Sequence, residues 1–128
     1  MIPGIHKLIL LVFFLSYTFS LKSQPIEGKL VEIQILDKIT ANVQSLIIAV
    51  NENLKFESIR IEIYACFKNP PEEVPENFVL LKIFDEINPN IISPIYQGWM
   101  ISSSPATTPL EHPIYDLWVK DCKIEIDF

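Results

Sequence analysis

The sequence predicts an all-β fold, a small antiparallel β-sandwich or barrel held by one disulfide. Three observations predict it. Apolar and polar residues alternate with a period of two rather than 3.6. Turn-forming residues recur about every ten positions, as they do between short strands. Two cysteines each end a strand-like run, and no window carries a sustained apolar stripe at helical spacing.

Residues 1–23 are predicted to be a secretory signal peptide. Lys7 supplies a positive charge, an uninterrupted apolar run extends from Leu8 to Leu15, and the small residues Ser20 and Ser23 offer cleavage sites. The alternative is an uncleaved segment that anchors the protein in the inner membrane, although spanning requires roughly 20 apolar residues and this run is shorter. A lipid anchor is not expected, because no cysteine follows the apolar run closely.

Residues 24–128 are expected to form a single β-domain, since about 105 residues is a typical domain size. Eight basic residues against sixteen acidic ones leave this part with a charge of −8. An acidic surface repels nucleic acid and anionic lipid, so we expect no nucleic-acid partner and no stable membrane insertion after cleavage. The acidity either maintains solubility or attracts a cationic partner. The sequence does not set an oligomeric state.

Cys66 and Cys122 are expected to form a disulfide, because an exported chain meets an oxidising compartment. The bond would close a loop of about 57 residues, which the chain-entropy model values at about 4 kcal/mol. A redox-active pair would favour the close Cys-x-x-Cys spacing, which is absent. With two cysteines and two histidines in the chain, a zinc site lacks its usual ligands, and we expect neither a metal nor a cofactor.

The first half of the domain carries three strand-like segments. Residues 30–36 alternate as in a half-buried strand, and residues 40–50 form a longer run rich in β-branched side chains. Turn formers at 51–53 lead to residues 54–56, so the segments 40–50 and 54–56 are expected to form a hairpin. Residues 58–67 alternate most cleanly of all.

The run 58–67 also makes a prediction about Cys66. Ile59, Ile61 and Ile63 share one face of a regular strand, and a period of two places Cys66 on the opposite face. If so, both faces of this strand must be covered.

Prolines divide the second half of the domain. The acidic, proline-rich segment 69–76 is expected to be an exposed loop that serves as a spacer, since proline lacks a backbone donor. Strands are expected at 78–84, 96–102 and 115–126. The last two are separated by a proline-rich connection at 103–113.

Four motifs together resemble a known family. The run GWMISSSPA at 98–106 is followed by LEHPIYDLWVKDC at 110–122. LDKIT stands at 36–40, and PPEE at 70–73 follows the first cysteine closely. With these four motifs in their order along the chain, the sequence resembles the DUF2155 family of uncharacterised, exported bacterial proteins. Because that family is known mainly from alphaproteobacteria, the resemblance implies a periplasmic location in a Gram-negative cell, and it implies no particular activity.

Catalysis is not expected. The serines at 102–104 lack the flanking glycines of a hydrolase nucleophile elbow. His112 and Asp116 have a spacing that suits a helix, which Pro113 disfavours. We therefore expect no enzyme, and we expect the serines and His112 to hydrogen-bond backbone groups in an ordered loop.

Aromatic residues that flank the connection 103–113 are the better candidates for function, because they grip partner chains or stack on sugars. Trp118, in an alternating strand, is expected to be core, and Trp99 is either core or surface. The main hypothesis is a non-enzymatic module that binds another envelope protein. The alternative is a glycan- or peptide-binding module that uses the same aromatics. The candidate binding surface comprises Tyr96, Gly98, Trp99, Met100, Ser103, Pro105, His112, Tyr115 and Asp116.

Overall fold

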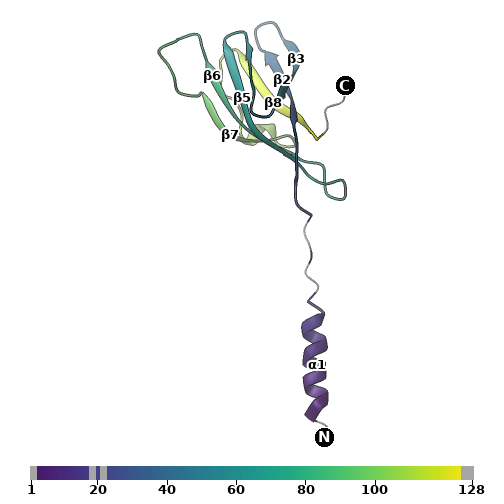
Figure 1. Cartoon of the computed structure of the whole chain (residues 1–128). Coiled ribbons are helices and arrows are strands. Elements are labelled where there is room, and N and C mark those ends of the chain that lie inside the picture. The colour runs from purple at the N-terminus through teal and green to yellow at the C-terminus, as the bar shows by residue number, and fades with distance from the viewer. Residues whose placement is uncertain (1–2, 18–19, 21–22, 125–128) are drawn as a thin grey trace.

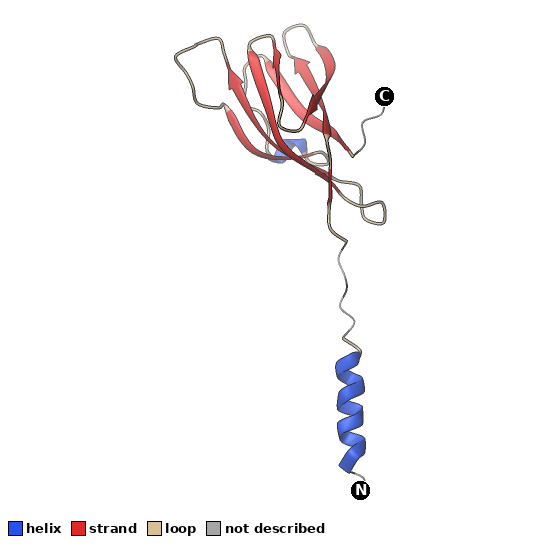
Figure 2. Ribbon diagram, viewed as in Figure 1, coloured by secondary structure: helices blue, strands red, loops and turns tan. Residues whose placement is uncertain are grey.

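Two antiparallel sheets face each other in the structure, and one helix lies apart from them (Figure 1). The computed structural model describes residues 3–17, 20 and 23–124. The prediction of a small antiparallel β-fold is confirmed, and its strands keep to two separate sheets, as in a sandwich (Figure 2). The elements in chain order are α1 (Pro3–Leu15), β1 (Ile26–Glu27), β2 (Leu30–Asp37), β3 (Asn42–Ala49), β4 (Asn53–Phe56), β5 (Ile59–Lys68), β6 (Asn77–Asp85), β7 (Tyr96–Ile101), the 3₁₀ turn η1 (Pro105–Thr107) and β8 (Tyr115–Lys123).

Helix α1 contains the apolar run assigned to the signal peptide, and its side chains from Gly4 onward are exposed. Among the described residues, no helix combines the length and the apolar character that crossing a membrane requires. The expected cleavage region 20–23 lies partly outside the described residues, because 21 and 22 are not among them. Residues 125 and 126, which the sequence assigned to the last strand, also lie outside them.

The two sheets differ in size. The large sheet has the order β1-β5-β6-β7, and β4 pairs with β5 as well. β4 lies along residues 59–62 of β5, and β1 lies along residues 67–68. The small sheet has the order β3-β2-β8. Period-two alternation located β2, β5, β6 and β7 to within one residue at each end.

The expected hairpin between 40–50 and 54–56 is wrong. β3 pairs with β2 in the small sheet, whereas β4 pairs with β5 in the large sheet. The turn formers are used, since Asn51 has a φ of 66°. However, the Asn51 N–H donates to the Ile63 carbonyl (2.8 Å), and the Ile63 N–H donates to the Glu52 carbonyl (3.1 Å). The turn therefore carries the chain from one sheet to the other.

The core lies between the two sheets and is built from alternate residues of their inner faces. Most of these side chains are β-branched, and such side chains pack well on a pleated surface. The core side chains with the least exposure are Val31, Ile33, Ile35, Ile59, Ile61, Ile63, Cys66, Val79, Leu81, Ile83 and Cys122.

The predicted orientation of Cys66 is also wrong, because β5 contains a β-bulge. Ile63 lies opposite Leu81, but Ala65 lies opposite Leu80, so Tyr64 is an extra residue on β5. An extra residue reverses the alternation that follows it. Cys66 therefore joins the inner face with Ile63 and is fully buried.

β8 contains a β-bulge as well. Its register against β2 shifts between Asp121 and Val119, which leaves Lys120 as the extra residue. In each strand the bulged residue stands two positions before the cysteine and is exposed, while the cysteine is buried. The two bulges thus turn Cys66 and Cys122 toward each other from facing sheets.

The disulfide joins the large sheet to the small sheet. Cys66 of β5 and Cys122 of β8 are bonded, with their Cα atoms 6.0 Å apart, so the predicted pairing is confirmed. Beside it, Lys68 forms an ion pair with Asp121 at 2.7 Å. Gly28, in the crossover from β1 to β2, is buried against both sulfur atoms.

Gly28→Ala should destabilise the protein by about 1–3 kcal/mol through overpacking. A Cβ atom at this position would overlap Cys122 Sγ and would lie 2.6 Å from Cys66 Sγ. Urea unfolding at neutral pH measures the loss.

The same substitution in a Cys66→Ala/Cys122→Ala background is the matched control. Without the sulfur atoms, the added methyl group should cost much less, and the difference between the two backgrounds measures the contact. An equal cost in both backgrounds would show that the disulfide is not what Gly28 accommodates.

Candidate functional site

Strand β7 divides the predicted binding surface between two faces. The pairing of β6 with β7 places Tyr96, Gly98 and Met100 on the inner side of the large sheet. Trp99 and Ile101 therefore point to the outer side. Met100 is only 3% exposed, whereas Trp99 is 44% exposed. The question that the sequence left open for Trp99 is decided in favour of the surface.

The outer face of the large sheet is apolar around Trp99, although the outer face of an antiparallel sheet is commonly polar. The register aligns two rows across β5, β6 and β7. The six residues of these rows, here called the Trp99 face, are Ala65, Phe67, Phe78, Leu80, Trp99 and Ile101. Trp99 is exposed, and the other five are half-buried. An apolar cluster of this kind on an outer face is a candidate for a contact surface.

Trp99 is held by local contacts. Its indole packs on the Phe67 ring with centroids 6.0 Å apart and planes inclined at 39°. The Tyr96 hydroxyl donates a hydrogen bond to the Trp99 carbonyl (3.0 Å). Gly98 has a φ of +152°, a conformation that side-chain-bearing residues rarely adopt. The backbone next to Trp99 thus depends on a glycine.

Polar residues adjoin the Trp99 face. The next row along the strands on the same outer face contains Glu62, Lys82 and Gln97. The Lys82 ammonium lies 5.1 Å from the centroid of the Tyr64 ring, which projects from the bulge. An apolar centre beside a polar border is the usual composition of a protein interface.

Ser103 belongs to a hydrogen-bond cluster at the end of β7. Its N–H donates to Glu76 Oε1 (3.0 Å), and its hydroxyl bonds to Glu76 Oε2. The Ser102 hydroxyl also donates to Glu76 Oε1 (3.0 Å). Partial burial by itself would raise the pKa of Glu76, but these bonds, together with the Asn77 N–H, lower the pKa below its ordinary value. The cluster fixes the end of β7 to the start of β6.

Asn77 links this cluster to the disulfide, and the sequence reasoning missed it. Its side-chain amide donates to the Ser102 hydroxyl (3.0 Å), and its Oδ1 accepts the Cys122 N–H (3.0 Å). It is 9% exposed. The available signal was a lone asparagine at the start of an apolar strand, where a buried amide must find partners.

His112 is a structural residue rather than part of a surface, since it is 7% exposed. Its Nδ1 accepts the N–H groups of Ile114 and Tyr115, both at 3.1 Å. The neutral ring therefore carries its proton on Nε2, which lies 3.1 Å from Asp85 Oδ2. The prediction that His112 bonds backbone groups in an ordered loop is confirmed, but the same prediction is wrong for Ser103, whose hydroxyl bonds the Glu76 carboxylate.

Of the remaining predicted residues, Pro105 and Asp116 line one small pocket together with Trp118, and Tyr115 does not. Tyr115 is buried and stacks against His112, with centroids 5.2 Å apart. Asp116 pairs with Lys38 at 3.2 Å rather than with His112, and the imidazole has Asp85 as its carboxylate partner. Pro105 is exposed at the start of η1.

The expectation that Trp118 is core is wrong. Trp118 lies opposite Gln34 on the outer face of the small sheet and is half-buried. Its indole N–H donates to Gln34 Oε1 (3.1 Å). The bulge in β8 follows Trp118, so alternation from Tyr115 to Val119 is regular and turns Trp118 outward while Leu117 points inward.

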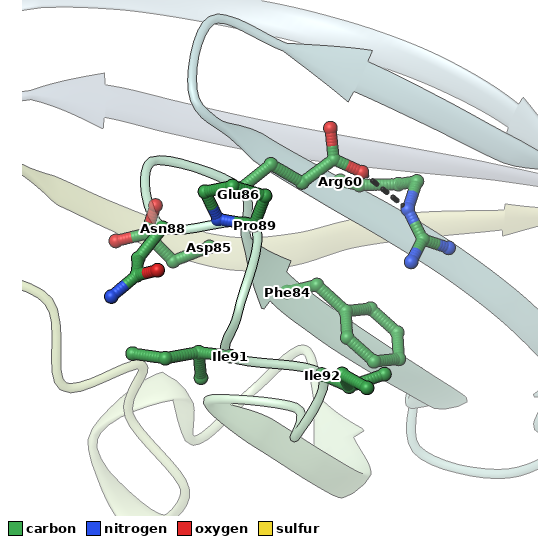
Figure 3. Close-up of a pocket in the computed structure, with 8 residues that line it drawn as sticks. All are labelled: Arg60, Phe84, Asp85, Glu86, Asn88, Pro89, Ile91 and Ile92. Carbon is green, nitrogen blue, oxygen red and sulfur yellow. Dashed lines mark hydrogen bonds and ion pairs between the residues drawn. The ribbon is translucent and has the colours of Figure 1, made fainter.

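A pocket of about 300 Å³ lies elsewhere, at the end of β6, and contains none of the predicted site residues (Figure 3). The Arg60 guanidinium in it is already occupied. It donates to Glu86 (2.7 Å), bonds to Glu62, and lies 4.3 Å from the centroid of the Phe84 ring. Within the described part of the chain, no cluster of three or more His, Cys, Asp or Glu side chains is placed to hold a metal ion. The pocket lining is: Arg60, Phe84, Asp85, Glu86, Asn88, Pro89, Ile91 and Ile92.

Residues 31–122 match the family model described as "Uncharacterized protein conserved in bacteria (DUF2155)". The chain belongs to the DUF2155 family. Both cysteines and Trp99 lie within the match. The chain is 34% identical over 87 residues to Uncharacterized protein RP359 of Rickettsia prowazekii (strain Madrid E), which covers 68% of this chain and 56% of that relative. The matched part is thus little more than half the length of the relative. No solved structure shows significant similarity to this DUF2155 protein.

Glu76→Gln should destabilise the protein at neutral pH and much less in acid. Because the folded-state pKa of Glu76 is lowered, its stabilising contribution is complete above the ordinary glutamate pKa, about 4.3. That contribution is lost as the pH falls through the ordinary value to the lowered one. Melting temperatures of wild type and variant between pH 3 and 7 measure the effect.

Glu73→Gln, which changes an exposed carboxylate in the 69–76 loop, is the matched control and should show no comparable pH-dependent difference. A Glu76→Gln effect that stays constant across this pH range would mean that the carboxylate charge is not what holds the cluster.

Proposed function

We propose that this DUF2155 protein is a non-enzymatic interaction module of the bacterial cell envelope that binds another protein through the Trp99 face. One observation carries the proposal. A tryptophan that is 44% exposed stands among apolar side chains on the outer face of the large sheet. Tryptophan is the residue type most enriched among interface hot spots, which makes Trp99 the anchor.

The packing and the apolar composition of the Trp99 face suit a protein partner. Trp99 lies opposite Leu80 of the neighbouring strand β6, and its ring packs on Phe67, which limits the positions that the indole can take. An ordered anchor loses little conformational freedom when a partner covers it. The neighbouring aliphatic side chains, such as Leu80 and Ile101, add apolar area that only an apolar partner surface would cover well.

The same aromatics carry the alternative, a glycan- or peptide-binding module. Sugar rings stack on exposed aromatic side chains but also require several polar groups that bind their hydroxyls. On β5 and β6 the residues beside Trp99 are apolar. Polar side chains stand in the next row along the strands, which contains Gln97. This composition favours a protein over a glycan.

Export to the periplasm is part of the proposal, with retention by an uncleaved N-terminal segment as its alternative. The apolar helix α1, with Lys7 near its start, precedes the β-domain as a signal peptide would. The buried Cys66–Cys122 bond supports an oxidising compartment, where structural disulfides persist.

The absence of catalysis is also part of the proposal. Ser103 and His112, which a serine–histidine hydrolase would use as nucleophile and base, bond to different partners: Ser103 to Glu76, and His112 to two backbone N–H groups and Asp85. A nucleophile and its base need to lie within hydrogen-bond reach of each other. Separate structural partners for these residues support a binding role.

Photo-crosslinking in living cells tests the proposal. A photoreactive amino acid at Gln97 lies beside Trp99 without replacing it, and a probe at Val74, which is 81% exposed in the 69–76 loop, is the control position. We expect one discrete crosslinked protein from position 97 and none from position 74.

Trp99→Ala in the same cells should abolish the adduct from position 97, since hot-spot truncation weakens binding by about 2 kcal/mol or more, at least thirtyfold. Tyr64→Ala, which removes another exposed aromatic from the same sheet, is the matched control and should leave the adduct in place. Adducts that are equally strong with and without Trp99, in a folded protein, would refute the proposed surface.

A further inference from the structure

The edge strand β3 stands out among the strands. It pairs with β2 on one side, and among the described residues no strand pairs with it on the other. In Figure 1, β3 and β7 lie at opposite sides of the domain, so this edge is separate from the Trp99 face. An open edge is a row of backbone donors and acceptors that can pair with another strand.

β3 lacks the features by which proteins normally block an open edge, namely short length, charges, proline or a bulge. It is eight residues long, its sequence NVQSLIIA contains no charged residue and no proline, and its register with β2 is continuous. The other edges differ. β8 has a bulge at Lys120, and β7 has Gly98 at a φ of +152°.

The alternation of hydrogen-bond direction along β3 identifies which of its backbone groups are free. The Val50 N–H donates to the Lys29 carbonyl (2.9 Å), and the Lys38 N–H donates to the Ile114 carbonyl of the segment before β8 (2.8 Å). Since bonding direction alternates along an antiparallel strand, the even-numbered residues of β3 bond to β2. Val43, Ser45 and Ile47 therefore direct their N–H and C=O groups at the open edge.

We propose that this edge pairs with the same edge of a second copy of the chain. A two-fold axis through Ser45 would make Ser45 face its own counterpart and would make Val43 of each copy face Ile47 of the other. All three positions have free backbone groups, so the Ser45–Ser45 pair and both Val43–Ile47 pairs are hydrogen-bonded, and the Gln44–Leu46 pairs between them are the non-hydrogen-bonded ones. The axis also keeps the inner and outer faces of the two small sheets aligned.

Exposure and charge argue for a second copy as the occupant. Val43 and Ile47 project from the outer face and are 49% and 47% exposed. In this register Val43 of each copy packs against Ile47 of the other, which gives two cross-strand pairs of β-branched residues. In a chain of net charge −6, these eight residues are uncharged, so a self-pair would not bring like charges together. The contact is isologous and closes as a dimer rather than a fibre.

Cysteine crosslinking of the full-length chain in cells tests the register. Ser45→Cys should give a disulfide-linked dimer on a non-reducing gel, because hydrogen-bonded partners have Cα atoms about 5.5 Å apart, within disulfide range. Ile39→Cys, in the exposed turn before β3, is the control and should remain monomeric. Co-expressed Val43→Cys and Ile47→Cys chains should crosslink more strongly to each other than each does to itself. Crosslinking that is equal at positions 39 and 45 would overturn the proposal.

Light scattering of the purified protein against concentration supplies the second test. Wild type should show a reversible monomer–dimer equilibrium, and Ser45→Lys should weaken it at least tenfold because two lysines would meet at the axis. Ile39→Lys should dimerise like wild type. Folding of each variant is checked by its intact Cys66–Cys122 bond. A wild type that is monomeric at all concentrations, or a dimer insensitive to Ser45→Lys, would overturn the proposal, whatever position 97 crosslinks to.

Discussion

The link between the two sheets at Cys66 and Cys122 is the constraint on which the rest of the structure depends. Both cysteines reach the inner face because each follows a bulge that adds one residue to its strand. Gly28 lets the β1–β2 crossover lie directly on the sulfur atoms, and Asn77 bonds the Cys122 backbone from β6. Covalent, steric and polar constraints thus coincide at one end of the sandwich.

The same bulge builds the proposed contact surface. With Tyr64 as the extra residue, Cys66 turns inward and its neighbour Phe67 turns outward. Phe67 then reaches Trp99 across the sheet, with ring centroids 6.0 Å apart. In a regular strand Phe67 would point into the core and Trp99 would lose this aromatic neighbour. The disulfide and the Trp99 face are therefore two consequences of one shift in register.

Local patterns predicted much of the fold and less of the site. Alternation and turn residues located the strands, because side-chain burial on a sheet repeats every two residues. The pairing of β4 with β5 was missed, although a two-residue turn at Glu57 and Ser58 joins them as a hairpin, because this turn lacks the glycine or asparagine that usually marks one. The bulges did leave a signal: in both β5 and β8, three apolar residues at spacing two are followed by a cysteine three positions later. At the site, no local pattern separates exposed Trp99 from buried His112, because only the assembled sheets decide what covers them.

The most direct test of this shared origin is the melting temperature after single-residue deletions in β5. Deleting Tyr64 removes only the extra residue, so Ile63 and Cys66 stay on the inner face and Phe67 on the outer one. Deleting Glu62 also shortens the strand by one residue, but it would drive Tyr64 into the place of Ile63. We expect the Tyr64 deletion to melt near wild type with its disulfide intact, and the Glu62 deletion to melt more than about 10 °C lower. Equal loss of stability in both deletions would contradict the role assigned to the bulge.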